Sequence, residues 1–286
     1  MIHILVTGAN GQLGKSIQNI ANNYPNLTFY FTDIDNLDVT STEALEFFFD
    51  NNQVNYIINC AAYTAVDKAE NDKQAALLLN TMAPLNLLKQ AEQHHAKLIH
   101  ISTDYVFSGN NFKPYKETDT PDPISIYGQT KLQGEINIRH SPEVIIIRTS
   151  WLYSPTGNNF VKTILKLTDT QEKLTIVADQ TGTPTYAKDL AEVILNIILF
   201  SDTNNVFING IYHYSNEGIC SWYDFAKSIL EIKNISKTIV PIRTSDLQYT
   251  APRPFFSVLE KTKIKNTFNL TIPYWRDSLK DCLHVL

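Results

Sequence analysis

Two polar residues near the middle of this 286-residue chain have the types and spacing needed for proton transfer. Tyr127 and Lys131 are four residues apart, so on a helix they share one face and lie one turn apart. A phenol has an unperturbed pKa near ~10, and a neighbouring ammonium group lowers that pKa by stabilising the phenolate. We therefore expect Tyr127 to donate and accept a proton near neutral pH. Because such pairs are common on helix surfaces, this interpretation depends on the surrounding elements.

A polar segment, Ser102–Phe107, directly follows the apolar run Lys97–Ile101, which is typical of a buried strand. The carboxyl ends of parallel strands meet at one edge of a sheet, and α/β proteins bind their ligands at that edge. This segment therefore stands in the predicted cleft, and Tyr127 and Lys131 follow it in the chain.

A glycine-rich turn near the N-terminus indicates the cofactor for this chemistry. Gly8, Gly11 and Gly14 follow the apolar run Ile2–Val6 and open a helical pattern with an apolar face. Glycines at such a turn allow tight turning, close approach of backbone to a pyrophosphate, and close packing of helix on strand. The anion then lies on unpaired N–H groups at the start of the helix. The spacing is G-x-x-G-x-x-G, so the strand–turn–helix context carries this interpretation.

Asp33 ends a second predicted strand, Thr28–Thr32, nineteen residues after Gly14. A carboxylate at this place accepts hydrogen bonds from the adenosine ribose and repels a 2′-phosphate, which favours NAD over NADP. A solvated turn aspartate is the alternative. Asp38 and Val39 form a second candidate wall for the adenine.

Strands and helices alternate through the first 150 residues, which predicts a parallel sheet covered on both faces. Further strands are expected at Tyr56–Ile58 and Val144–Ile147, and helices at Lys73–Gln93, with a kink at Pro84, and through Lys131 to Ile138. Thr40 and Glu43 form a predicted capping box. Beyond residue 150 the sequence favours helices at Asn159–Leu167, Ala187–Leu199 and Trp222–Ile232, and strands at Leu174–Val177 and Ile211–Tyr214.

The predicted fold is α/β: a Rossmann-type doubly wound parallel sheet with a smaller C-terminal substrate-binding lobe. We expect residues 1–150 to form the NAD(P)-binding core, to which the chain returns at about 173–214. Residues 151–172 and 215–286 form the predicted substrate-binding lobe, which is rich in prolines and polar turns.

The composition excludes several classes of protein. Hydrophobic residues make up 43% and charged residues 19% of the chain, as in ordinary globular proteins. A net charge of −5 disfavours binding to nucleic acid or to an anionic membrane. The three cysteines show no metal-ligand spacing, and neither a signal peptide nor an apolar run of about 18 residues is seen. We therefore expect a cytoplasmic protein with reduced thiols and no metal site.

Together, the glycine turn, Thr103 and Tyr127-x-x-x-Lys131 resemble the extended short-chain dehydrogenases/reductases. Five further segments narrow the resemblance to the dTDP-4-dehydrorhamnose reductases, and they match in order along nearly the whole chain. They are Asn59–Glu70, Ser102–Phe107, Arg148–Tyr153, Asp179–Thr185 and Ala251–Pro254.

The resemblance implies reduction of the 4-keto group of dTDP-4-dehydro-L-rhamnose, the last step of dTDP-rhamnose biosynthesis, with NADH or NADPH. Tyr127 would protonate the forming alkoxide, Lys131 would assist it and bind the cofactor ribose, and Thr103 would hydrogen-bond the carbonyl. The implied cofactor residues also include Gly8, Asn10, Gly11, Gln12, Leu13, Gly14, Ala61, Ala62 and Tyr63. The implied substrate residues also include Val66, Asp67, Asp104, Tyr105, Phe107, Trp151, Asn159 and Arg253. Arg253 suits a diphosphate independently of the resemblance, because its guanidinium is a planar fork of donors.

Two alternatives remain open at this point. Another nucleotide-sugar epimerase, dehydratase or reductase would share these motifs, although a dehydratase would need an acidic pair beside Thr103, and only Asp104 is present. A non-catalytic NAD(P)-binding regulatory subunit, as in methionine adenosyltransferase, also resembles this family. Some relatives hold Mg²⁺ between two subunits through a glutamate after the third glycine. Lys15 and Ser16 occupy those positions in this chain, which argues against a bound Mg²⁺. A monomer or a homodimer is expected.

Overall fold

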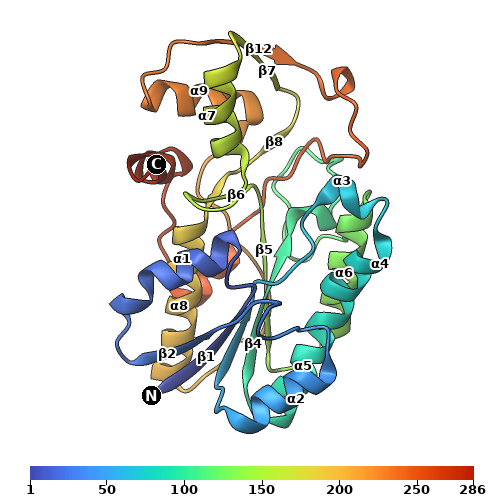
Figure 1. Cartoon of the computed structure of the whole chain (residues 1–286), viewed down its shortest axis with the longest axis vertical. Helices are drawn as coiled ribbons and strands as arrows, with labels where there is room; N and C mark the ends of the chain where they lie inside the picture. The colour runs from blue at the N-terminus through green and yellow to red at the C-terminus, as the bar shows by residue number, and fades with distance from the viewer.

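The centre of the molecule is a six-stranded parallel sheet, seen in a computed structural model that describes residues 1–286 (Figure 1). Its strand order is β10-β5-β4-β3-β1-β2, and all neighbouring strands run parallel. The order changes direction beside β1, which is where sheets of this kind bind ligands. The predicted Rossmann-type fold is confirmed. The strands are β1 (Ile2–Thr7), β2 (Leu27–Phe31), β3 (Tyr56–Asn59), β4 (Lys97–Thr103), β5 (Val144–Thr149) and β10 (Gly210–His213).

Helices cover both faces of this sheet. α1 (Gln12–Ile20) and α8 (Ala187–Asn204) lie on one face, and α2 (Thr42–Asn51), α5 (Ala83–Gln93) and α6 (Ile126–Ile138) lie on the other (Figure 1). Successive side chains of a strand point to opposite faces, so the strands feed two apolar clusters. Ile4 and Val6 of β1 join the cluster of α1 and α8, and Leu5 between them joins the cluster of α2 and α5.

The predicted helix Lys73–Gln93 is present but interrupted. It consists of α4 (Lys73–Leu77), a π-helical segment over Leu78–Met82, and α5. Pro84 lies in the first turn of α5, where the absence of a backbone donor is tolerated. The structure therefore has a widened π-helical turn before the proline, where the sequence predicted a kink at Pro84.

The predicted capping box of α2 is wrong by one residue. Ser41 is the N-cap, and its hydroxyl accepts the Ala44 N–H at 3.2 Å. The Thr40 hydroxyl instead donates to Asp38 at 2.7 Å. The hydroxyls of Thr40 and Ser41 are both chemically able to cap the helix. Ser41 caps it because the Thr40 hydroxyl is bonded to Asp38 instead.

A smaller lobe lies beyond the carboxyl ends of the strands (Figure 1). Its own apolar cluster joins α7, α9 and α11 with β7. Its elements are α7 (Phe160–Thr170), α9 (Trp222–Ile232), α11 (Trp275–His284), β6 (Leu152–Tyr153), β7 (Lys173–Val177), β8 (Thr181–Gly182), β9 (Thr185–Tyr186), β11 (Cys220–Ser221) and β12 (Thr238–Ile242). None of the helices combines the length and apolar content that crossing a membrane requires.

Packing changes the predicted limits of the two lobes in two places. β7 pairs with β12 and packs in the smaller lobe, although 173–214 was expected in the core. α10 (Thr262–Phe268) packs through Ile264 and Phe268 on the α8 face of the large sheet, although 215–286 was expected in the lobe. We therefore propose that β7 belongs to the smaller lobe, and that the chain returns to the core at α8 and again at α10.

Candidate active site between the two lobes

The glycine turn after β1 has the geometry of a dinucleotide site. Gly8 has a φ of +63°, and a Cβ on it would lie 2.7 Å from the Ala61 nitrogen. A Cβ on Gly14 would lie 2.5 Å from the Ala9 Cα, so α1 can approach the turn only with glycine there. Gly11 is the N-cap of α1 and supplies no side-chain acceptor, so the first N–H groups of this helix can receive a pyrophosphate. These residues fit an NAD(P) cofactor.

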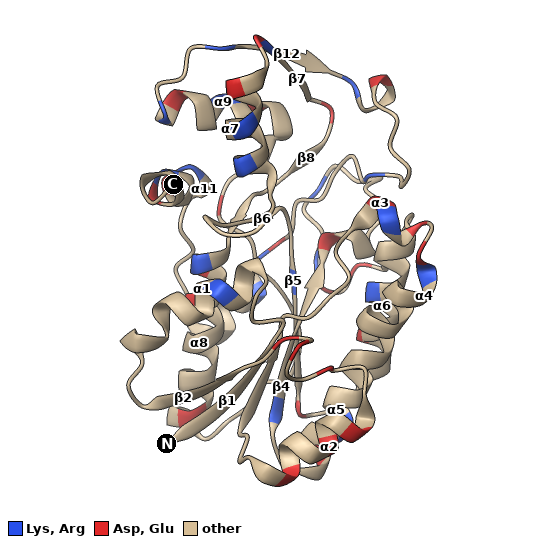
Figure 2. Cartoon of the chain, viewed as in Figure 1, with Lys and Arg blue, Asp and Glu red and all other residues tan.

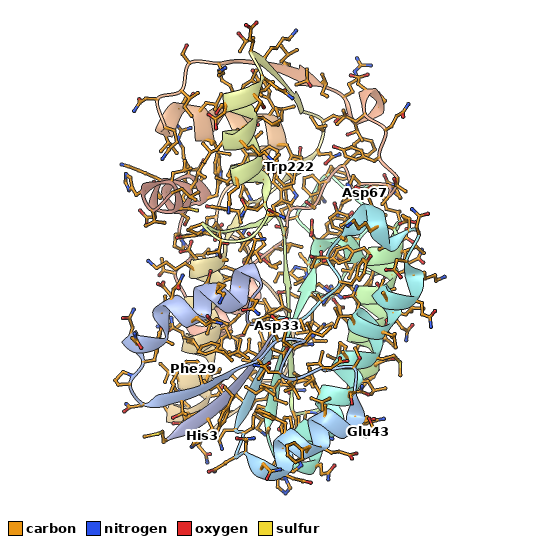
Figure 3. All side chains as sticks on the ribbon, in the orientation of Figure 1. His3, Phe29, Asp33, Glu43, Asp67 and Trp222 are labelled. Atoms are coloured by element: carbon orange, nitrogen blue, oxygen red, sulfur yellow. The ribbon has the colours of Figure 1, made fainter.

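A pocket beside this turn collects most of the predicted adenosine-binding and nicotinamide-side residues. Asp33 accepts the Asn10 N–H at 2.8 Å, so its carboxylate also anchors the glycine turn. Figure 3 shows Asp33 at the end of β2, close to that turn. The lining includes the predicted residues Gly8, Gly11, Asp33, Asp38, Val39, Ala61, Ala62 and Tyr63.

A second pocket, between the glycine turn and the smaller lobe, collects the predicted catalytic residues. β4 ends at Thr103, and Tyr127 lies in the first turn of α6, whose N-cap Ser125 accepts the Gly128 N–H at 3.2 Å. The sheet edge and the helix start thus bring the hydroxyl and the phenol to one cleft. The lining includes Gly11, Gln12, Leu13, Ala62, Val66, Thr103, Asp104, Tyr105, Tyr127, Lys131 and Trp151.

The predicted lowering of the Tyr127 pKa by Lys131 is wrong for this structure. Burial raises the pKa of Tyr127 to about 12, although a hydrogen bond with Thr103 opposes the rise. The Nζ atom of Lys131 is turned away, toward the Ile101 carbonyl at 2.6 Å and the ring of His100 at 3.3 Å. Tyr127 is therefore protonated at neutral pH, as a proton donor must be.

A buried ion pair, which the sequence did not predict, lies next to Lys131. Glu135 and Arg148 are each 1% exposed, and the Arg148 guanidinium binds both carboxylate oxygens of Glu135. Glu135 also accepts the Ser102 hydroxyl at 2.5 Å. Burial lowers the pKa of Lys131 to about 8, and the Glu135 charge opposes this shift. The pair ties α6 to β4 and β5 directly behind the reactive side chains.

Asp104 is the acidic group of this pocket. Burial raises the pKa of Asp104 to about 7, and hydrogen bonds from Ser257 and Thr103 oppose the shift. Its Oδ2 atom has no hydrogen-bond partner within the protein. This oxygen is buried, in a residue that lines the cleft, and a buried polar atom without a partner calls for an explanation.

A third pocket continues from Tyr105 into the smaller lobe and contains Arg253. Arg253 Nη2 lies 2.5 Å from Asp67 Oδ2, and its guanidinium lies 4.9 Å from the centre of the Tyr249 ring. Its Nη1 atom is buried without a hydrogen-bond partner. A cation with an unused donor and aromatic neighbours suits a nucleoside diphosphate. The lining also includes Phe160, Thr175, Ile176, Val177, Gln180, Trp222 and Leu247.

Trp151 connects the second and third pockets. Its ring stacks on Trp222 with a centroid separation of 3.6 Å, and its backbone has a φ of +48°. That conformation is rare for a bulky residue and is maintained by surrounding contacts, as is frequent at ligand sites. Figure 3 places Trp222 in the smaller lobe and Asp67 on the facing part of the large lobe. The sequence analysis missed Trp222 and Tyr249, since nothing in their spacing relates them to Trp151.

Three predicted substrate residues do not line these pockets: Phe107, Asn159 and Asp67, of which Asp67 contacts Arg253 of the third pocket. Phe107 is 1% exposed and stacks on Tyr115 with ring centroids 4.1 Å apart, so it belongs to a core cluster with Leu259. Asn159 caps α7 by accepting the Lys162 N–H at 3.1 Å, and it donates to Gln12 Oε1 at 2.8 Å. The burial of Phe107 in this core cluster contradicts its predicted role, whereas the roles of Asn159 and Asp67 stay predictions.

The chain is similar to a single family over nearly its full length. A family model described as "RmlD substrate binding domain" matches residues 2–286. The dTDP-4-dehydrorhamnose reductase of Aggregatibacter actinomycetemcomitans is 38% identical, and the alignment covers 98% of each chain.

Two solved structures extend this similarity. The dTDP-4-dehydrorhamnose reductase of Clostridium acetobutylicum superposes with a TM-score of 0.93 at 41% identity, over 99% of each chain. The enzyme of that name from Bacillus anthracis, solved in complex with NADP, superposes with a TM-score of 0.91 at 36% identity, over 100% of each chain. With the site geometry, these similarities show that the chain belongs to the RmlD substrate binding domain family, whose members here are named dTDP-4-dehydrorhamnose reductases.

Proposed function

We propose that this chain reduces the 4-keto group of dTDP-4-dehydro-L-rhamnose to dTDP-L-rhamnose with NADH or NADPH. The supporting observation is a series of three adjoining pockets that share lining residues: one at the dinucleotide turn, one with Thr103 and Tyr127, and one with aromatic residues and Arg253. Relatives named dTDP-4-dehydrorhamnose reductase, one of them solved with NADP, support the same activity.

The bound cofactor would supply the hydride, and the chain would supply the proton and the positioning. The Thr103 hydroxyl would hold the carbonyl oxygen, and Tyr127 would donate its phenolic proton to the forming alkoxide. A pKa of about 12 keeps Tyr127 protonated before the reaction. Lys131 would bind the cofactor ribose, with Ala61, Ala62 and Tyr63 on the nicotinamide side.

The smaller lobe would bind the nucleotide part of the substrate. We assign the diphosphate to Arg253 and the base to the aromatic pocket of Trp222 and Tyr249. Val66, Asp67, Asp104, Tyr105 and Trp151 would surround the sugar. Acidic and basic residues are interspersed over both lobes (Figure 2), so a local cation such as Arg253 must supply the attraction for the diphosphate.

Asp33 would favour NADH, although the relative from Bacillus anthracis was solved with NADP. We further propose that the protein works in the cytoplasm as a monomer or homodimer, and that Mg²⁺ is not required.

Oxidation of NADH or NADPH, followed by absorbance with the enzymatically generated keto sugar, tests the proposal. We expect turnover in the parent chain and its loss in Tyr127→Phe. Binding of NADH without any turnover would instead favour a regulatory NAD(P)-binding protein.

A further inference from the structure

A row of buried polar side chains runs behind the cleft, from the glycine turn to Lys131. Thr7 Oγ1 lies 2.8 Å from Asn59 Oδ1, Asn59 Nδ2 lies 3.0 Å from His100 Nδ1, and His100 Nε2 lies 3.3 Å from Lys131 Nζ. Thr7, Asn59 and His100 are fully buried and Lys131 is 1% exposed. The row ends inside the protein at Thr7, so it offers no path for protons to solvent.

Hydrogen-bond chemistry fixes the direction of each contact in this row. The Ala61 backbone N–H can only donate, and it lies 3.2 Å from Asn59 Oδ1. The amide of Asn59 must therefore present its oxygen to Ala61 and its NH₂ group to His100. His100 Nδ1 must accept, so a neutral His100 carries its proton on Nε2.

The Nε2–H of His100 consequently points at Lys131. A neutral amine has a lone pair that can accept this proton, whereas an ammonium group has donors only. Lys131 Nζ still donates to the Ile101 carbonyl at 2.6 Å. Every donor in this row thus has an acceptor when Lys131 is neutral. A charged Lys131 would instead place its own N–H donors against the Nε2–H of His100.

We propose that His100 is a positioning residue that holds Lys131 as a neutral amine away from the cleft, and that cofactor binding draws Lys131 toward the ribose with uptake of one proton. The proton passes from solvent to Nζ, and the resulting ammonium donates to ribose hydroxyls. This inference depends on the proposed role of Lys131 as a ribose ligand.

The other ionisable groups around Lys131 leave a usable pH window. Glu135 favours a charged Lys131, but its carboxylate is already paired with Arg148. Burial lowers the pKa of Lys131 to about 8 and raises the pKa values of Tyr127 and Cys60 to about 12. Proton uptake should therefore appear as the pH rises through about 8.

Calorimetric titration of the full chain with NADH measures this uptake directly. Runs in two buffers with different ionisation enthalpies, at about pH 6.5 and about pH 9, bracket the Lys131 pKa of about 8. We expect little uptake at the lower pH, close to one proton at the higher, and an affinity that falls about tenfold per pH unit above the pKa. A protein that binds NADH without uptake at about pH 9 would overturn the inference and leave the proposed function intact.

Variants separate His100 from other groups. In His100→Gln the side-chain oxygen can accept from both Asn59 and a Lys131 ammonium, so we expect uptake at about pH 9 to fall and NADH affinity there to rise. His213→Gln changes another fully buried histidine and should keep the uptake. Asp104→Asn removes the cleft carboxylate whose pKa is about 7 and should also keep it. Unchanged uptake in His100→Gln would contradict the assigned role.

A second measurement needs neither cofactor nor turnover. Nitrogen-15 NMR of the imidazole rings in the unliganded parent chain distinguishes the two neutral tautomers, and His100→Gln assigns the signal. At about pH 9, where Lys131 with its pKa of about 8 is neutral, we expect the proton of His100 on Nε2. A proton on Nδ1 at that pH would refute the inference even if the protein proves to be an active reductase.

Discussion

Replacing Arg253 tests the proposed diphosphate site. The side chain is 13% exposed and is oriented before any ligand binds, by Asp67 on one side and by the Tyr249 ring below it. Such preorganisation reduces the ordering cost of binding. Nη1 remains buried and unpartnered, so one donor is available to a phosphate oxygen.

The expected effect follows from the strength of that contact. A hydrogen bond to a charged group contributes about 1.5–3 kcal/mol, which corresponds to roughly 10- to 150-fold in affinity. Arg253→Ala should raise the dissociation constant for dTDP by this factor. Arg253→Lys should recover only part of the loss, because one ammonium cannot reproduce the planar fork that contacts Asp67 and a phosphate together.

Calorimetry with dTDP at low salt measures these constants, and NADH serves as the internal control. Asp67→Asn is the matched variant: it removes the partner charge but leaves the guanidinium, so dTDP binding should fall far less than in Arg253→Ala. Asp67 is 44% exposed, so losing its partner should cost little stability. If Arg253→Ala and Arg253→Lys both bind dTDP as well as the parent, Arg253 only forms an ion pair with Asp67, and the diphosphate binds elsewhere.

Four other changes test the remaining parts of the site. Tyr127→Phe should lower kcat by at least ~10²-fold while NADH affinity is retained; a near-parental rate would contradict the assignment of the proton donor. Asp33→Ala should raise the ratio of kcat/KM for NADPH to kcat/KM for NADH. An unchanged ratio would show that Asp33 only anchors the glycine turn through Asn10. Glu135→Gln breaks a buried ion pair and should lower the free energy of unfolding in urea by about 3–5 kcal/mol; parental stability would mean that the pair is dispensable. Burial raises the pKa of Asp104 to about 7, so its stabilising proton is lost as the pH rises through that value. The gain in Tm of Asp104→Asn over the parent should thus be larger at about pH 8 than at about pH 5, and a pH-independent difference would refute this.

The sequence alone was sufficient for the sheet, the cofactor turn and the positions of the reactive groups. The glycines after β1, the strand end at Thr103 and the pair on α6 are local features, in which hydrophobic period and turn chemistry act over a few residues. Strand alternation then fixes a parallel sheet, and parallel strands bring their carboxyl ends to one edge whatever the details of packing. These features therefore placed Thr103 and Tyr127 in one cleft before any contact was known.

Only the tertiary structure decided which side chains are free to act. Asp67 meets Arg253 across 186 positions, and Glu135 meets Arg148 because α6 packs behind β4 and β5. Phe107 has the right position in sequence, but it is buried against Tyr115. Whether Lys131 lowers the pKa of Tyr127 likewise depends on the direction of its side chain, which His100 and the Ile101 carbonyl set. Such contacts join elements far apart in the chain, and their burial determines the cost of charge, so no local pattern encodes them.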